Sequence, residues 1–169
     1  MTAISRRPSD AMNCHEGRGT QRLDRRFAFE GGIDCLPMYV KRTLDRLALK
    51  IGRGQWLSMT DQERVSIGEL STKSEEDCEA GKEIVRNILR RYGTAPTLLP
   101  QSAECFADPP TQAPAEVIES AREVGVLLDQ EKWSELNTDQ RYALTKLIDS
   151  GKKNKRKRAL MEFFAALSD

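Results

Sequence analysis

The chain has 169 residues, of which 38% are apolar and 31% are charged, a composition typical of a soluble globular protein. This composition excludes a wholly disordered chain, and because the longest apolar runs span only a few residues it also excludes a membrane span. The length suffices to bury a core in one domain or in two very small ones.

Charge is distributed unevenly along the chain. Residues 1–26 carry six basic and three acidic side chains, and residues 151–169 carry six and two, whereas residues 27–150 carry 15 and 21. Basic ends on an acidic body can attract an anionic partner, but they also keep chain ends solvated, and we favour the second interpretation.

The arginine pairs near the amino terminus are not followed by the apolar stretch of about 7–15 residues that an export signal needs. We therefore expect a cytoplasmic protein. In that compartment Cys14, Cys35, Cys78 and Cys105 are expected to be reduced thiols, without disulfides.

The predicted elements begin after a disordered arm at residues 1–26, which has hardly any apolar periodicity. Pro37 suits the first position of a helix because it lacks the N–H that a helix start leaves unpaired. Apolar residues then recur at spacings of three and four, which predicts one buried helical face: Val40, Leu44, Leu47 and Ile51.

Two further helices are predicted in this half. Thr60 is a good N-cap and Glu63 completes a capping box with it. Ser74 caps the next helix, which should end at Gly93. The predicted apolar face of that helix consists of Ile84, Val85, Ile88 and Leu89.

Residues 93–114 hold five of the seven prolines, too many for a helix, so we predict a linker at residues 94–113. A second set of helices follows: one starting at Pro114 and ending at Gly125, one capped by Asn137 or Thr138, and one at the carboxyl end. Their apolar positions are Val117, Ile118, Ala121, Val124, Leu160, Phe163, Phe164 and Leu167.

An internal repeat relates the two halves, since residues 37–70 align without gaps to residues 114–147. Identical pairs include Trp56 with Trp133 and Arg64 with Arg141. We predict an all-α fold of two related three-helix units, at residues 27–93 and 114–169. In each unit a short extended link carries the Trp, and the two units pack together as one domain.

The repeated Trp and Arg allow two interpretations. Each Trp ring can be buried between helices of its own unit with the Arg stem over it, which we favour because buried Trp usually stabilises through packing. Alternatively, a groove for a partner is formed by Pro37, Met38, Trp56, Arg64, Trp133 and Arg141.

No motif predicts catalysis, a cofactor or a metal. The cysteines are at least 20 residues apart, unlike the close pairs of metal sites. The single histidine, His15, lies in the predicted arm beside Cys14, where it could not be held in the fixed geometry that acid–base catalysis needs. No phosphate-cradling glycine loop is present. We therefore expect a non-enzymatic protein.

The basic run "KKNKRKR" at residues 152–158 could bind nucleic acid by neutralising phosphates. It lacks interleaved aromatic residues and runs directly into a helix with an apolar face. We favour a solvated helix start and keep nucleic-acid binding as an alternative.

The stretch "FAFEGGIDCLPMYVKRTLDRLALKIGRGQWLSMTDQER" resembles the opening of the nitrate reductase associated protein family. The residues that carry the resemblance are Phe27, Phe29, Glu30, Cys35, Leu36, Pro37, Met38, Leu44, Asp45, Lys50, Ile51, Gln55, Trp56, Glu63 and Arg64. Later segments are similar to the family's ending, so the resemblance spans roughly residues 27–164. Family members carry further cysteines where this chain has "ELST" and Leu47.

The resemblance implies a small helical cytoplasmic protein that acts alongside assimilatory nitrate reductase. We expect an accessory or maturation factor that binds the reductase or its maturation machinery. A thiol-based metal or redox-responsive protein is the alternative. Since "CLPM" precedes only the first repeat, Cys35 is the candidate functional thiol.

Overall fold

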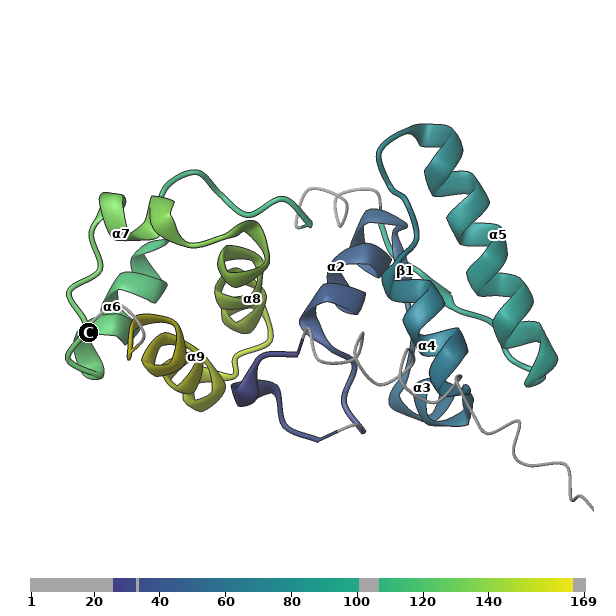
Figure 1. The fold of residues 1–169 in the computed structure, drawn as a ribbon, viewed down its shortest axis with the longest axis horizontal. Helices are drawn as coiled ribbons and strands as arrows, with labels where there is room; N and C mark the ends of the chain where they lie inside the picture. The colour runs from purple at the N-terminus through teal and green to yellow at the C-terminus, as the bar shows by residue number, and fades with distance from the viewer. Residues whose placement is uncertain (1–25, 33, 101–106, 166–169) are drawn as a thin grey trace, which may run out of the picture.

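The computed structural model describes residues 26–32, 34–100 and 107–165, so nearly all of the predicted amino-terminal arm lies outside the described residues, as do Cys14, His15, Cys105 and Leu167. The described chain is mainly helical, which confirms the all-α prediction at that level (Figure 1). In chain order the elements are η1 (Ala28–Glu30), α2 (Met38–Arg46), β1 (Leu49–Lys50), α3 (Arg53–Ser58), α4 (Asp61–Gly68), α5 (Glu75–Arg91), β2 (Thr97–Leu98), α6 (Ala115–Glu123), α7 (Gln130–Glu135), α8 (Thr138–Asp149) and α9 (Lys153–Ala165).

The repeat is visible in the element boundaries. α6 and α7 begin and end 77 residues after α2 and α3, and α8 begins 77 residues after α4. The predicted extended link is wrong in both halves, because the Trp lies on a short helix instead. The Gln55 side chain accepts the Gly52 amide at 2.8 Å, and the Asp129 side chain accepts the Lys132 amide at 2.9 Å, so both short helices have capped starts.

The predicted N-caps are confirmed. The Thr60 hydroxyl accepts the Glu63 amide while the Glu63 carboxylate accepts the Thr60 amide, which completes the predicted capping box. The Ser74 side chain caps α5 by accepting the Asp77 amide, and Asn137 caps α8 through a capping box with Gln140. Gly93 and Gly125 follow their helices with φ of 70° and 77°, the left-handed conformation that glycine adopts without strain.

The first long helix is shorter than predicted. α2 ends at Arg46, and Leu47 and Ile51 are buried without being helical. Ala48 has a φ of 49°, after which β1 pairs antiparallel with β2, Leu49 opposite Leu98. The sheet was not predicted, because a two-residue strand is too short for an alternating pattern. The predicted linker therefore holds β2 and is tied to the first unit.

The apolar residues form two cores, one in each half. The first unites α2, β1, α3, α4 and α5 around Val40, Leu44 and Trp56. The second unites α6, α7, α8 and α9 around Trp133 and Leu160, and it also takes in Phe29 and Met38 from the start of the chain. Ile84, predicted on the buried face of α5, is 42% exposed.

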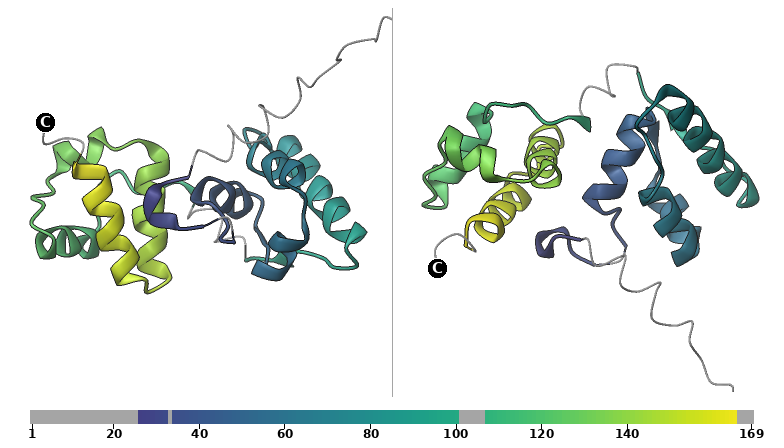
Figure 2. Two further views of the ribbon diagram at one scale, coloured as in Figure 1. Left: turned by 60° about the horizontal axis from the view of Figure 1, so that its bottom comes forward. Right: turned by 45° about the horizontal axis from the view of Figure 1, so that its top comes forward.

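The halves meet where α2 packs against α8, at the centre of the molecule in Figure 1. η1 also crosses to the second half and packs on α9, as the views in Figure 2 show. The ring of Phe27 meets that of Phe163 edge-on, with centroids 4.8 Å apart. Residues 27–30, which we predicted in the first unit, therefore pack on the second, because their aromatic rings complete its core.

The end of α4 leaves no room for a side chain at Gly68. A Cβ there would lie 2.2 Å from Cε2 of Tyr39, whose ring is buried. We expect Gly68→Ala to lower the free energy of unfolding by about 1–3 kcal/mol, measured by chemical denaturation. Gly54→Ala is the matched control, because nothing lies within 4 Å of that Cβ, and it should leave stability unchanged or slightly higher. Equal effects would contradict this packing.

Candidate functional site

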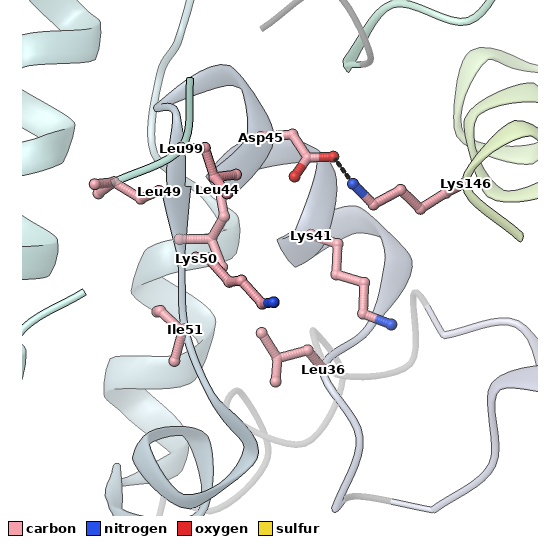
Figure 3. Close-up of a pocket in the computed structure, with 9 residues that line it drawn as sticks. All are labelled: Leu36, Lys41, Leu44, Asp45, Leu49, Lys50, Ile51, Leu99 and Lys146. Carbon is pink, nitrogen blue, oxygen red and sulfur yellow. Dashed lines mark hydrogen bonds and ion pairs between the residues drawn. The ribbon is translucent and has the colours of Figure 1, made fainter. Parts of the chain in front are cut away.

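Two adjoining cavities lie between the halves and share Leu36, Lys41, Lys50 and Lys146 as wall residues. Their volumes are about 300 and 320 Å³. We call the pair the inter-unit cleft. Figure 3 shows the first cavity, in which residues of α2 and β1 face Lys146 of α8.

The first cavity of the inter-unit cleft is mainly apolar. Its lining includes Leu36, Leu44, Leu49, Ile51 and Leu99, brought together by α2, β1 and the segment after β2. The β1–β2 pairing places Leu99 here, since the Leu99 amide donates to the Ala48 carbonyl at 2.7 Å. The unpredicted sheet therefore shapes this wall.

Asp45 ties the two halves together at the edge of this cavity. Its carboxylate is buried and accepts hydrogen bonds from the Tyr142 hydroxyl at 2.8 Å and from Lys146 Nζ at 2.5 Å. Burial and the neighbouring Asp45 charge raise the pKa of Tyr142, so its hydroxyl remains a donor at neutral pH. Asp45 is therefore a partnered structural carboxylate.

The second cavity is basic. Lys152 and Lys155 join Lys41, Lys50 and Lys146 in its lining, and Cys35 lies among them. Lys155 Nζ donates to the Glu30 carbonyl at 3.3 Å. Among the described residues, five lysines and the two carboxylates of Glu30 and Asp45 line the inter-unit cleft as a whole.

The Glu30 carboxylate has a structural role at the start of α2. It is buried and accepts the amide of Met38, the first residue of α2, at 3.2 Å to each oxygen. Burial raises the pKa of Glu30, while the hydrogen bonds from the Met38 and Phe27 amides oppose that effect. The carboxylate thus caps the helix start, where a negative charge is favourable.

Lys41 is a largely buried lysine of the inter-unit cleft. Burial lowers its pKa, and the nearby Lys152 charge lowers it further, whereas Glu30 raises it. Across the part of the chain that the structure describes, no carboxylate lies within salt-bridge distance of Lys41, Lys50 or Lys152. The inter-unit cleft therefore carries excess positive charge.

The predicted partner residues of the first repeat lie in its core. Trp56 is fully buried, and the Arg64 guanidinium lies 5.3 Å from the centre of its ring. Arg64 Nε also donates to the Trp56 carbonyl at 2.9 Å. This geometry is the buried Trp with an overlying Arg that we favoured.

The second repeat buries its Trp in the other core. Trp133 is fully buried and its indole Nε1 donates to the Pro110 carbonyl at 3.1 Å. Arg141 is half-buried, and its Nε makes no hydrogen bond to a described group. Because the two Trp rings belong to separate cores, the structure does not bring them together on one surface.

Residues of the "CLPM" stretch do reach the inter-unit cleft. Cys35 and Leu36 are half-buried and line it, and Met38 lines it from the start of α2. Pro37 is buried and precedes α2 as its N-cap. Lys41 and Lys146 had no sequence signal, because they are 105 residues apart and meet only through the packing of α2 on α8.

Within the described ranges, no group of three or more His, Cys, Asp or Glu side chains is placed to hold a metal ion. Cys35 and Cys78 are free thiols there, and Cys78 packs against the first core. No helix of the described part is both long and apolar enough to span a membrane.

Most basic side chains of the run at residues 152–158 form ion pairs or hydrogen bonds with other parts of the protein. Lys153 and Lys157 pair with Glu123 at 2.8 and 2.6 Å, and together they lower the pKa of that carboxyl to about 2. Arg156 is buried and donates to the Ser120 hydroxyl at 2.8 Å. This use of the run favours the predicted helix start over a nucleic-acid surface.

Fold and site define a small helical repeat protein with a basic cleft between its halves. The chain belongs to the family of conserved nitrate reductase-associated proteins, whose sequence profile matches residues 26–164. No curated protein and no solved structure gives a significant match. Nine residues that carry the resemblance also line the inter-unit cleft: Phe29, Glu30, Cys35, Leu36, Met38, Leu44, Asp45, Lys50 and Ile51.

Proposed function

We propose that this protein is a non-enzymatic accessory or maturation factor of assimilatory nitrate reductase that binds the reductase or its maturation machinery in the cytoplasm. The observation that carries the proposal is the family match, which extends from the segment before η1 into the last turn of α9. A single-domain arrangement, with the second unit packed on the first, would present one continuous surface to such a partner.

The outer face of α5 is a suitable contact surface for this partner. α5 is the helix farthest from the second half in Figure 1, and a shallow groove on it is lined by Ile84, Asn87, Ile88, Arg90 and Arg91. An exposed apolar side chain next to arginines is a composition enriched at protein interfaces. We place the reductase contact here, because Trp56 and Trp133 are buried.

Co-purification tests this function. The tagged protein, expressed in its host under nitrate assimilation, is expected to retain nitrate reductase or its maturation factors. Ile84→Asp should weaken that retention, because it places a charge in the apolar part of the groove.

Leu127→Asp is the matched control, because Leu127 is 77% exposed and lies in the second half. If the wild-type protein retains neither reductase nor maturation factors, the adaptor function is wrong. If Ile84→Asp and Leu127→Asp retain the partner equally, the contact lies elsewhere than α5.

The alternative of a thiol-based metal or redox-responsive protein rests on Cys35, which is half-buried in the inter-unit cleft. Elemental analysis of the purified protein distinguishes the two functions. Stoichiometric metal that is lost in Cys35→Ser would favour the thiol-based function over the adaptor.

A further inference from the structure

We infer that the inter-unit cleft is a binding site for a small organic oxyanion, a carboxylate or phosphate ester with an apolar body, whose charged group lies among Lys41, Lys50 and Lys152. This site is independent of the proposed reductase contact on α5. The inter-unit cleft is concave, carries excess positive charge, and has an apolar part beside a basic part.

The size of the inter-unit cleft suits a small molecule. Its two cavities of about 300 and 320 Å³ share wall residues from both halves of the protein. Small-molecule sites are typically concave spaces of about 300–1,000 Å³ at the junction of structural units. A macromolecular partner would instead need a more open surface.

The charge of the inter-unit cleft selects an anion. The Asp45 carboxylate is already bound to Lys146 and Tyr142, and the Glu30 carboxylate is bound to the start of α2. Among the described residues no salt bridge compensates Lys41, Lys50 or Lys152. A concave site with one sign of charge concentrates counter-ions, so an oxyanion is favoured there.

The electrostatic state of Lys41 agrees with this assignment. Its pKa is lowered by burial and by the nearby Lys152 and Lys155 charges, and the Glu30 charge offsets only part of this effect. A bound oxyanion would supply that compensation. Lys is a compact point charge and a common ligand for phosphate and carboxylate oxygens.

The apolar first cavity of the inter-unit cleft indicates that the ligand also has an apolar body. Leu36, Leu44 and Ile51 line the space beside Lys41 and Lys50, as Figure 3 shows. An inorganic ion would leave this apolar surface unused, whereas an alkyl or aryl group would bury it favourably. An amphipathic anion therefore fits both parts of the inter-unit cleft.

Isothermal titration calorimetry on the purified full-length chain tests the site with four probes: hexyl phosphate, hexanoate, 1-hexanol and inorganic phosphate. One or both amphipathic anions are expected to bind more tightly than hexanol and than inorganic phosphate, with an affinity that falls as salt is raised. The relative affinities of hexyl phosphate and hexanoate identify the preferred oxyanion.

Lys41→Met should weaken binding of the preferred anion by about tenfold or more, because it removes a charged donor while keeping an apolar stem. Lys50→Met provides a second test, since Lys50 is exposed and its loss should not disturb folding. Lys73→Met is the control, because Lys73 is exposed and outside the inter-unit cleft, and it should bind as the wild type does.

The inference is overturned if neither amphipathic anion binds at millimolar concentration, or if both lysine variants bind as tightly as the Lys73→Met control. It is equally overturned if hexanol binds as tightly as the anions, since the lysines would then contribute nothing. None of these measurements involves nitrate reductase, so their outcome is separate from that of co-purification.

Discussion

Replacing Trp56 or Trp133 by alanine is expected to lower the free energy of unfolding by about 3–5 kcal/mol, the range for removing a large buried side chain. Both rings are fully buried, each in the core of its own half. Trp56→Ala also removes the ring beneath the Arg64 guanidinium, and Trp133→Ala leaves the Pro110 carbonyl without its indole donor. Chemical denaturation followed by circular dichroism measures the loss.

Leu57→Ala is the control for Trp56→Ala, because Leu57 is the next residue on α3 and is 43% exposed, so a much smaller loss is expected. The same variants separate the two interpretations of the repeated Trp. Variants that keep wild-type stability yet no longer retain the reductase would assign the rings to an interface and contradict the core assignment.

The second large effect is expected at Asp45, the carboxylate that joins α2 to α8. Asp45→Ala should lower the free energy of unfolding by roughly 2–4 kcal/mol, somewhat less than for a fully buried ion pair, because the Lys146 side chain is 30% exposed. The variant leaves the buried Tyr142 hydroxyl without its acceptor and Lys146 without its countercharge.

A double-mutant cycle with Tyr142→Phe tests the coupling behind this prediction. The phenylalanine substitution should cost less in the Asp45→Ala background than in the wild type, because the hydrogen bond is already absent there. Asp108→Ala is the control, since that aspartate pairs with Arg46 but is 69% exposed, and little change is expected. Additive effects at Asp45 and Tyr142 would show that the contact contributes little.

Local chemistry explains which elements could be predicted. The capping residues Thr60, Ser74 and Asn137 act within three residues of their own helix starts, and each functions as its side-chain type predicts. By contrast, periodicity alone could not end α2 at Arg46, because Leu47 and Ile51 are buried in the non-helical chain as well. A buried position is compatible with either structure, and only pairing with β2 decides between them.

The candidate site shows the same division between local and long-range information. Because "CLPM" precedes only the first repeat, the sequence indicated Cys35 as a candidate functional thiol, and Cys35 lies in the inter-unit cleft. The lysines around it could not be found in this way. From the sequence, Lys41 is an ordinary solvated residue on the polar side of its helix. Only in the folded chain do α8 and the start of α9 lie beside it.

By itself, the sequence determined the helical class, the capped starts of α4, α5 and α8, the 77-residue repeat and the family, because these depend on residue types and on short spacings. Only the tertiary structure decided that η1 joins the second core, that the two Trp rings lie apart and that five lysines converge on one cleft. The physical reason is that cores and clefts are assembled from segments distant in the chain, whose meeting depends on the packing of whole elements.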